Sequence, residues 1–241
     1  MKPKNTLISL FCGAGGLDWG FKLSGKFDII FGNDISEPAT YTHSINFGTK
    51  HVTHQPEASD LPAVFLGDVS KLEIDRFEGL RRDVVTGGPP CQDFSIVRGP
   101  TKERAGIEVS RGRLYSYFVR ALIHLQPRVF VFENVPGLKS ANRGEAYKVI
   151  LEDFSALNIR WSEIKKLVGN NSRITPQDYE IIYSDLVDAS KLGVPQARKR
   201  LIIIGLRKDL SQSIQWKVDV LKEKVRNALN GKGRLVSKYP L

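Results

Sequence analysis

One residue of this sequence, Cys91, suggests covalent chemistry, and an acidic residue, Glu133, follows the next apolar run. Cys91 comes after Gly87-Gly88-Pro89-Pro90, in which two prolines fix the backbone ahead of the thiol. A free cysteine is usually an inert buried residue, but Gly-Gly-Pro-Pro is a poor core sequence. We therefore interpret Cys91 as a nucleophile that is held in attack geometry. Glu133 should lie beside it, because consecutive parallel strands tend to be neighbours.

A glycine-rich turn follows the first apolar run and predicts a close approach between the backbone and a ligand. Its sequence, Phe11-Cys12-Gly13-Ala14-Gly15-Gly16, permits a tight turn before a helix. It is not a dinucleotide fingerprint, because the third glycine is misplaced, and it is not a phosphate loop, because no Gly-Lys-Ser/Thr follows. Taken alone, the turn is equally consistent with a structural role.

Asp34 and Asp68 end the next two apolar runs. A carboxylate at the end of the second strand of such a domain can accept both hydroxyls of a ribose, and one at the end of the third can accept an exocyclic amine. Each aspartate alone is better explained as a helix cap or a turn residue. Together with the glycine turn, they predict a pocket for a nucleoside cofactor.

Basic residues are concentrated in three places. In Pro195–Arg200, the side chains of Gln196, Arg198 and Arg200 alternate, which puts them on one face of an extended segment. The segments 95–113 and 207–241 have net charges of +3 and +6, and the whole chain has 36 Lys and Arg against 26 Asp and Glu. The excess favours a polyanionic partner, although a solvated surface explains the tail equally well.

The elements that must position these residues alternate between strands and helices. Seven short apolar runs read as strands: Thr6–Phe11, Asp28–Phe31, Ala63–Leu66, Asp83–Thr86, Val129–Phe132, Glu180–Leu186 and Arg200–Leu206. Leu114–Leu125 has one apolar stripe at helical spacing and ends before Pro127. This alternation predicts an α/β fold, a mostly parallel sheet flanked by helices, with ligands beyond the carboxyl ends of the strands.

Composition excludes several other classes of protein. Hydrophobic residues make up 41 % of the 241 residues, enough for a sizeable core, and no apolar run is long enough to span a bilayer. Cys12 and Cys91 are the only cysteines, so neither a disulfide scaffold nor a four-cysteine zinc site is possible. The four histidines suggest no metal site, and we expect the reducing cytoplasm.

Taken in their order along the chain, the glycine turn, the two aspartates, the Cys91 segment, Glu133 and the segment Pro195–Arg200 resemble the motifs of the cytosine-5 DNA methyltransferases. The resemblance covers residues 6 to 207 and rests on the Phe-x-Gly-x-Gly turn, Pro-Pro-Cys-Gln, Glu-Asn-Val and Gln-x-Arg-x-Arg. It implies a Rossmann-like fold that binds S-adenosylmethionine and methylates carbon 5 of a cytosine flipped out of duplex DNA.

The resemblance also implies a role for individual residues of the cofactor site. Asp34 would hold the ribose, although the family often has Glu there, and Asp68 would contact the adenine amine. Ile35 would lie against the adenine ring. The remaining cofactor-binding residues would be Phe11, Gly13, Gly15, Gly16, Leu17, Val69 and Pro90.

By the same resemblance, Cys91 would attack the cytosine, Glu133 would protonate it, Arg198 would orient the base and Arg200 would support the loop. The segment 95–113 would be a mobile loop that closes over DNA. The DNA-binding residues would be Gln92, Ser95, Arg98, Lys102, Arg104, Arg111 and Gln196.

Complete members of the family continue with a target-recognition domain and two further motifs, whereas only 35 residues follow Leu206. We expect residues 1–206 to form the catalytic and cofactor-binding domain and 207–241 a basic tail. We favour a split enzyme, a heterodimer whose second chain supplies target recognition, over a truncated fragment or an inactive remnant. Trp216–Leu229 has an apolar stripe that suits a helix packed on its own body or on a partner.

Two other functions stay open at this point. One branch of the family methylates tRNA, but its Cys-Phe-Thr motif is not found in this sequence. A non-catalytic cofactor-binding or DNA-binding subunit is the other alternative, and the presence of both Cys91 and Glu133 argues against it. Neither the DNA target sequence nor an accompanying restriction endonuclease can be deduced from these residues.

Overall fold

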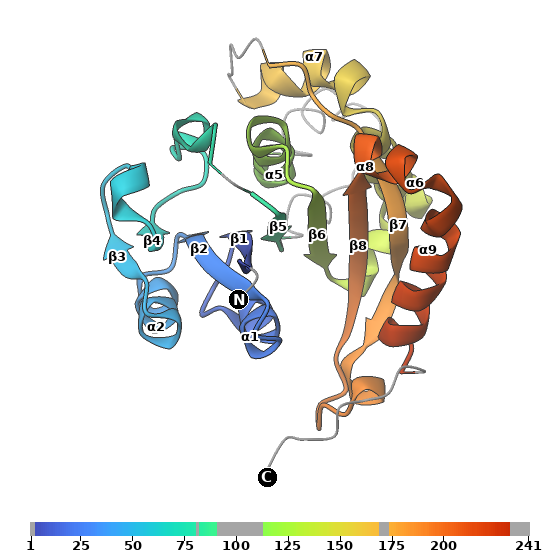
Figure 1. Ribbon diagram of the computed structural model, residues 1–241, viewed down its shortest axis with the longest axis horizontal. Coiled ribbons are helices and arrows are strands. Elements are labelled where there is room, and N and C mark those ends of the chain that lie inside the picture. The colour runs from blue at the N-terminus through green and yellow to red at the C-terminus, as the bar shows by residue number, and fades with distance from the viewer. Residues whose placement is uncertain (1–2, 81, 91–112, 169–173, 232–241) are drawn as a thin grey trace.

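The computed structural model describes residues 3–80, 82–90, 113–168 and 174–231, and these form one eight-stranded sheet with helices on both faces (Figure 1). The strands are β1 (Asn5–Leu10), β2 (Phe27–Asp34), β3 (Lys50–Val52), β4 (Ala63–Leu66), β5 (Val84–Gly87), β6 (Val129–Asn134), β7 (Tyr179–Asp188) and β8 (Lys199–Arg207). The α-helices are α1 (Gly16–Leu23), α2 (Glu37–Phe47), α5 (Arg113–Leu125), α6 (Glu145–Ser155), α7 (Leu157–Val168), α8 (Lys208–Ser213) and α9 (Gln215–Leu229). Short 3₁₀ turns are η1 (Ala58–Asp60), η2 (Ile74–Phe77), η3 (Pro136–Lys139), η4 (Ala141–Gly144) and η5 (Ala189–Leu192).

The strand order is β3-β4-β2-β1-β5-β6-β8-β7. The first six strands of the chain are parallel, whereas β8 runs antiparallel to both β6 and β7. The sheet therefore confirms the mostly parallel α/β fold that the sequence predicts. All seven expected strands are present, and the sequence analysis missed only the three-residue edge strand β3.

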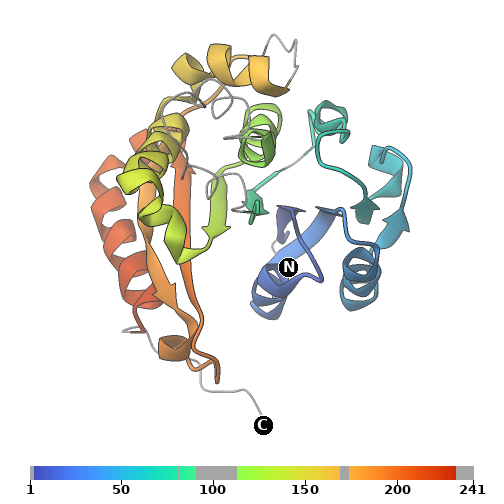
Figure 2. The same cartoon turned by 180° about the vertical axis from the view of Figure 1, so that it is seen from behind.

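Helices cover both faces of the sheet because its strands are apolar on both sides. Both views show α1 and α2 on one face and α5 on the other (Figures 1 and 2). Leu7 of β1 belongs to a small cluster with Phe21 and Phe47 from the first face. Its neighbour Ile8 belongs to the main core, which includes Phe118 of α5. Successive residues of one strand thus point to opposite layers.

Aromatic rings fill the core between the sheet and α5, α6. Phe118 of α5 and Phe154 of α6 lie against Phe130 and Phe132 of β6, with ring centroids 4.5–6.1 Å apart. Tyr179 of β7 joins them and donates a 2.9 Å hydrogen bond to the Pro127 carbonyl, so its buried hydroxyl is satisfied. These contacts attach the antiparallel end of the sheet to the parallel part.

The expected helix at Trp216–Leu229 is confirmed as α9, and it lies alongside β7 at the end of the sheet (Figure 1). Val218 is buried, and Leu221, Val225 and Leu229 are partly buried, whereas Val220 is exposed. Lys222 donates a 2.6 Å hydrogen bond to Glu180 of β7. The helix packs on its own body here, and the contact of this helix with a partner stays a prediction.

Within the described ranges, no helix is both long and apolar enough to cross a membrane. The segment between α7 and β7 is partly described. Helix α7 ends at Val168, the positions 174–178 have no regular structure, and 169–173 lie outside the described residues.

A buried carboxyl group in this core makes the stability of the fold depend on pH. Asp153 of α6 is 7 % exposed, and its side chain lies 3.4 Å from the Tyr115 hydroxyl and 3.7 Å from the Arg160 guanidinium. Burial raises the pKa of Asp153 from 3.8 to about 6, against the opposing effect of Arg160. The folded state therefore binds this proton more tightly than the unfolded chain does.

We predict that Asp153→Asn becomes more stable relative to the wild type as the pH rises. The stabilising contribution of the neutral Asp153 is complete below the unfolded pKa and is lost as the pH rises through the folded one. Between about pH 4 and pH 8, the difference in the free energy of unfolding should shift by roughly 2–3 kcal/mol in favour of the variant. Urea unfolding at both pH values measures it, with Glu152→Gln as the control on the same helix. A pH-independent difference would contradict the assignment.

Candidate cofactor and catalytic site

The turns that carry the candidate residues meet at one edge of the sheet. Strands β1, β2, β4, β5 and β6 are parallel, so their carboxyl ends share this edge. In the register of β5, Gly87 is paired with Leu10 on one side and with Phe132 on the other. The glycine turn after β1, the Gly88-Pro89-Pro90 turn after β5 and Glu133 of β6 are consequently neighbours.

The glycine turn has a left-handed backbone at Phe11, Gly13 and Gly15, with φ of 54°, 54° and 89°. Gly15 is also confined by its surroundings, because a Cβ there would lie 2.1 Å from the Phe47 ring of α2. At Gly13 the space is open, with nothing within 4 Å of such a Cβ. The turn therefore leaves its backbone accessible at Gly13, while Gly15 packs it against α2.

Asp34 fixes this turn from the end of β2. One of its carboxylate oxygens accepts a 2.8 Å hydrogen bond from the Gly13 backbone N–H, and the other accepts a 2.9 Å bond from that of Ser36. An ionised carboxylate offers about four acceptor positions, so two stay available to a ligand. Asp34 can therefore fix the turn, which is the explanation it has when taken alone, and still have acceptor positions for the hydroxyls of a ribose. Next to it, Ile35 is 71 % exposed, and Leu17 is also exposed.

Asp68 stands in a loop, after β4, that is held by its own backbone and by a buried amide. The Asn33 side chain donates to the carbonyls of Phe65 and Gly67, at 3.2 and 2.8 Å. The Asp68 carboxylate accepts a 2.8 Å bond from the Ser70 N–H, and Val69 is buried. Along the carboxyl edge of the sheet, Asp68 lies one strand beyond Asp34, because β4 pairs with β2.

A buried ionisable pair beneath the glycine turn was not expected from the sequence. His43 Nε2 of α2 lies 3.1 Å from Asp18 Oδ2 of α1, and both residues are 0 % exposed. The other polar atoms of these side chains, Asp18 Oδ1 and His43 Nδ1, have no hydrogen-bond partner among the described residues. Asp18 resembled an ordinary acidic residue of a first helical turn, and no sequence signal connected it with His43.

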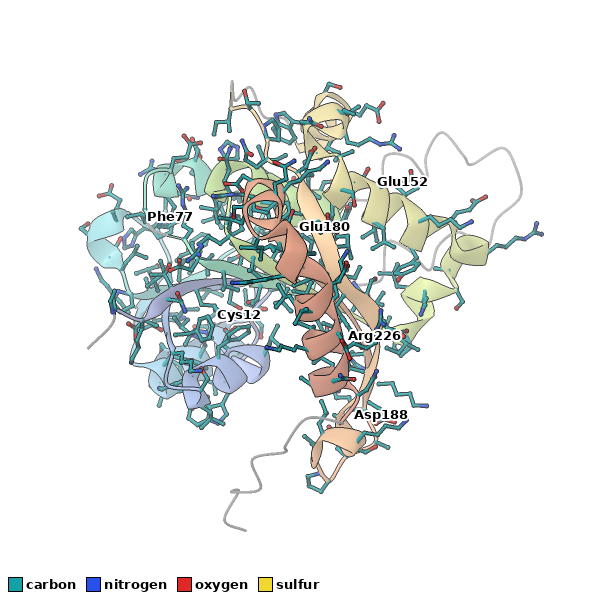
Figure 3. All side chains as sticks on the ribbon, turned by 45° about the vertical axis from the view of Figure 1, so that its right-hand side comes forward. Cys12, Phe77, Glu152, Glu180, Asp188 and Arg226 are labelled. Carbon is teal, nitrogen blue, oxygen red and sulfur yellow. The ribbon has the colours of Figure 1, made fainter. Side chains whose placement is uncertain are left out.

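Of the two cysteines, the structure describes Cys12, which is labelled in Figure 3. Burial, with the nearby carboxylates of Asp18 and Asp34, holds the pKa of the Cys12 thiol well above its usual value. A thiol in that state is a poor nucleophile. Cys91 lies outside the described residues, and so do the other predicted DNA-binding positions of that segment, namely Gln92, Ser95, Arg98, Lys102, Arg104 and Arg111.

Glu133 lies beside the turn that leads to Cys91. A Cβ on Gly88 would be 3.0 Å from Glu133 Oε2, and the next residue, Asn134, donates a 3.0 Å hydrogen bond to the buried Pro89 carbonyl. Arg200 of β8 forms a 2.9 Å ion pair with Glu133, and both side chains are about a quarter exposed. Pro90, which is exposed, is the last described residue before Cys91.

Only one of the three polar residues of the 195–200 segment reaches this group. Arg200 contacts Glu133, whereas Gln196 and Arg198 lie on an exposed stretch before β8. The Arg198 carbonyl accepts a 2.9 Å bond from the Ala189 N–H, which closes the β7–β8 connection. The described part of the chain has no group of three or more His, Cys, Asp or Glu that could hold a metal ion.

Comparison with known proteins gives a family match over most of the chain. Residues 5–237 match the family "C-5 cytosine-specific DNA methylase". The chain is 54 % identical over 240 residues to DNA (cytosine-5-)-methyltransferase M.ApeKI of Aeropyrum pernix, a match that covers 97 % of this chain and 51 % of that protein. It is 34 % identical to Type II methyltransferase M.BbvI of Brevibacillus brevis, covering 91 % of this chain and 54 % of that protein. The chain thus spans about half the length of the curated relatives it matches.

Solved structures give the same result for the fold. A prophage-encoded protein from E. coli, described as a DNA modification methyltransferase, is 30 % identical with a TM-score of 0.57, covering 86 % of this chain and 48 % of that one. The S. pombe Dnmt2 methyltransferase has a TM-score of 0.54 at 17 % identity, covering 84 % of this chain and 49 % of that one, and supports the fold alone.

The two glycines of the turn give a matched pair of substitutions. Gly15→Ala should lower the free energy of unfolding by about 3 kcal/mol, because it combines a left-handed backbone with overpacking against Phe47. Gly13→Ala should cost only about 1 kcal/mol, because it meets the backbone penalty alone. Denaturant unfolding of both variants measures the difference, and equal losses would show that Phe47 does not confine Gly15.

Proposed function

Because the chain belongs to the C-5 cytosine-specific DNA methylase family, we propose that it transfers a methyl group from S-adenosylmethionine to carbon 5 of a cytosine in duplex DNA. The observation that supports this most directly is the position of Glu133, beside the Gly-Gly-Pro-Pro turn that immediately precedes Cys91. The 54 % identical relative is named as a DNA (cytosine-5-)-methyltransferase, which favours DNA over tRNA as the substrate.

The edge formed by β1, β2 and β4 fits the nucleoside part of S-adenosylmethionine. Asp34 has acceptor positions left for the ribose hydroxyls, and the exposed side chain of Ile35 suits the adenine ring. Asp68 would accept the adenine amine. The turn would wrap the cofactor through Phe11, Gly13, Gly15, Gly16 and Leu17, with Val69 and Pro90 completing the contacts.

When bound, S-adenosylmethionine supplies an electrophilic methyl group. The sulfur of Cys91 would add to carbon 6 of the cytosine and make carbon 5 electron-rich. Negative charge would then develop toward ring nitrogen 3, where Glu133 would hold a proton. Loss of the carbon-5 proton to a base would finally expel Cys91 and restore the ring. A reducing cytoplasm would keep this thiol available.

Three neighbouring residues support these two groups. Arg200 holds the Glu133 carboxylate through the 2.9 Å ion pair, and Asn134 holds the Pro89 carbonyl of the cysteine turn. Arg198 is exposed at the same end of β8 and would orient the base. Strand β6 and its partner β8 would therefore set the distance between the proton donor and the nucleophile.

We propose that the base is flipped out of the duplex, since Cys91 cannot reach a stacked cytosine. The net charge of +10 would supply phosphate contacts. Their residues would be Gln92, Ser95, Arg98, Lys102, Arg104 and Arg111, with Gln196 on the β8 side.

We further propose that target recognition comes from the half of the relatives' length that this chain does not span, supplied by a second subunit. The product of the neighbouring gene is the first candidate for such a subunit. On this proposal, the chain alone should bind DNA without sequence preference.

Cys91→Ser is the experiment that tests the proposed function. The substitution should abolish methylation, because a hydroxyl is a far weaker nucleophile than a thiolate. It should leave S-adenosylmethionine affinity within about twofold, since Cys91 touches the base rather than the adenosine. Cys12→Ser is the matched control and should retain activity, because the Cys12 thiol is not used.

Methylation is assayed with the purified chain together with the product of the neighbouring gene, and cofactor affinity by calorimetry. If affinity fell in parallel with activity in Cys91→Ser, this residue would belong to the cofactor site instead. If Cys91→Ser kept full activity, the proposed reaction would be wrong.

A further inference from the structure

Arg120 is a buried cation whose role the sequence did not indicate. It lies on α5, is only 8 % exposed, and its Nη2 donates to the carbonyls of Val69 and Leu72, at 2.8 and 2.9 Å. Its guanidinium carbon is 4.7 Å from the centre of the Tyr117 ring. Within the described ranges it forms no ion pair with a carboxylate, and its buried Nε has no hydrogen-bond partner.

Burial of a charge in this way is costly, and an apolar residue at this position of α5 would avoid the cost. Desolvation lowers the pKa of Arg120, in keeping with that expense. The two backbone carbonyls and the face of the Tyr117 ring partly offset the cost of burying the Arg120 charge, and all three groups have fixed positions in the fold. A guanidinium held in this manner fixes the backbone that it contacts.

The contacted backbone is the loop that presents Asp68. Val69 directly follows Asp68, and Leu72 ends the turn before η2. Asn33 anchors the start of the loop through the Gly67 carbonyl, and Arg120 anchors the remainder through Val69 and Leu72. The Asp68 carboxylate sits between these two anchors, and among the described residues its hydrogen bond is to Ser70 of its own loop. Its position therefore follows from the backbone.

A second arginine, Arg82, also donates two hydrogen bonds to backbone carbonyls, and its role is structural. Arg82 Nη1 donates to the carbonyls of Phe77 and His124, at 3.2 and 3.0 Å. It joins the end of η2 to the last turn of α5 and is partly buried. Both arginines thus connect α5 with the chain between β4 and β5, but only Arg120 holds the loop with Asp68.

On the premise of the proposed function, we propose that Arg120 is a positioning residue which fixes the Asp68 loop and thereby sets the preference of the cofactor site for adenine. Asp68 is an acceptor for the exocyclic amine of adenine. Hypoxanthine has an oxygen at that position, so a correctly placed carboxylate rejects it. When the loop is loosened, the carboxylate loses its fixed position and the discrimination decreases.

The test compares the binding of S-adenosylhomocysteine and S-inosylhomocysteine to the full chain by calorimetry. The wild type should bind the adenine compound at least about tenfold more tightly, in keeping with the loss of a hydrogen bond to a charged group. In Arg120→Gln this preference should fall below about threefold, whereas Arg120→Lys, which keeps the charge, should recover part of it. Arg82→Gln is the matched control and should keep the wild-type preference.

The outcomes separate this inference from the proposed function. If the wild type binds neither compound, the proposed function fails, and the inference fails with it. If the wild type prefers adenine and Arg120→Gln is only less stable, with an unchanged ratio of the two affinities, Arg120 is structural and the inference alone is overturned. Circular dichroism establishes that each variant is folded, and Arg120→Lys decides the question if Arg120→Gln does not fold.

Discussion

Backbone pairing between β5 and its two parallel neighbours is the constraint on which the site depends. Gly87 ends β5 between Leu10, the last residue of β1, and Phe132 of β6, so the chain segments after β1 and β5 leave the sheet beside Glu133 of β6. A side chain at Gly87 has no room, because its Cβ would lie 2.6 Å from the Phe118 ring. This close packing brings the glycine turn, the Gly88-Pro89-Pro90 turn and Glu133 to one place.

Side chains from neighbouring strands and helices then fix the backbone of each turn. Asp34 holds the N–H of Gly13, Asn33 holds the Gly67 carbonyl, and Asn134 holds the Pro89 carbonyl. Arg120 acts in the same way on the Asp68 loop. In each case, a side chain anchored in regular structure satisfies a polar group of an irregular segment. Hydrogen bonds from regular structure therefore fix the backbone of these segments.

The strands were predictable because they follow from local patterns, and so was the position of Glu133 beside Gly88. Apolar runs identify strands, and consecutive parallel strands tend to be neighbours, which placed Glu133 correctly beside the Gly88 turn. The helical spacing of Val218, Leu221 and Val225 likewise identified α9. Strand β3 was not predicted, because three residues are too few to show an alternating or apolar pattern.

The buried polar contacts were not predictable, because sequence spacing does not reveal partners across the fold. Asp18 and His43 come from separate helices and meet only after both pack on the sheet. Arg120 lies in a helix whose periodicity is dominated by apolar residues, so nothing in the sequence distinguishes it from a solvent-exposed arginine. Its contacts with Val69 and Leu72 bridge about 50 positions of the chain, the separation over which local reasoning has no information.

The central claim is that the turn after β5 presents Cys91 to a cytosine while Glu133 lies beside it. Covalent trapping tests this most directly, since 5-fluorocytosine in DNA blocks the release of the nucleophile. The chain, its neighbouring gene product, S-adenosylmethionine and the modified duplex are incubated together, and the adduct is mapped by mass spectrometry. We predict a covalent adduct on the peptide that contains Cys91. Methylation of ordinary DNA with no such adduct at Cys91 would contradict the account.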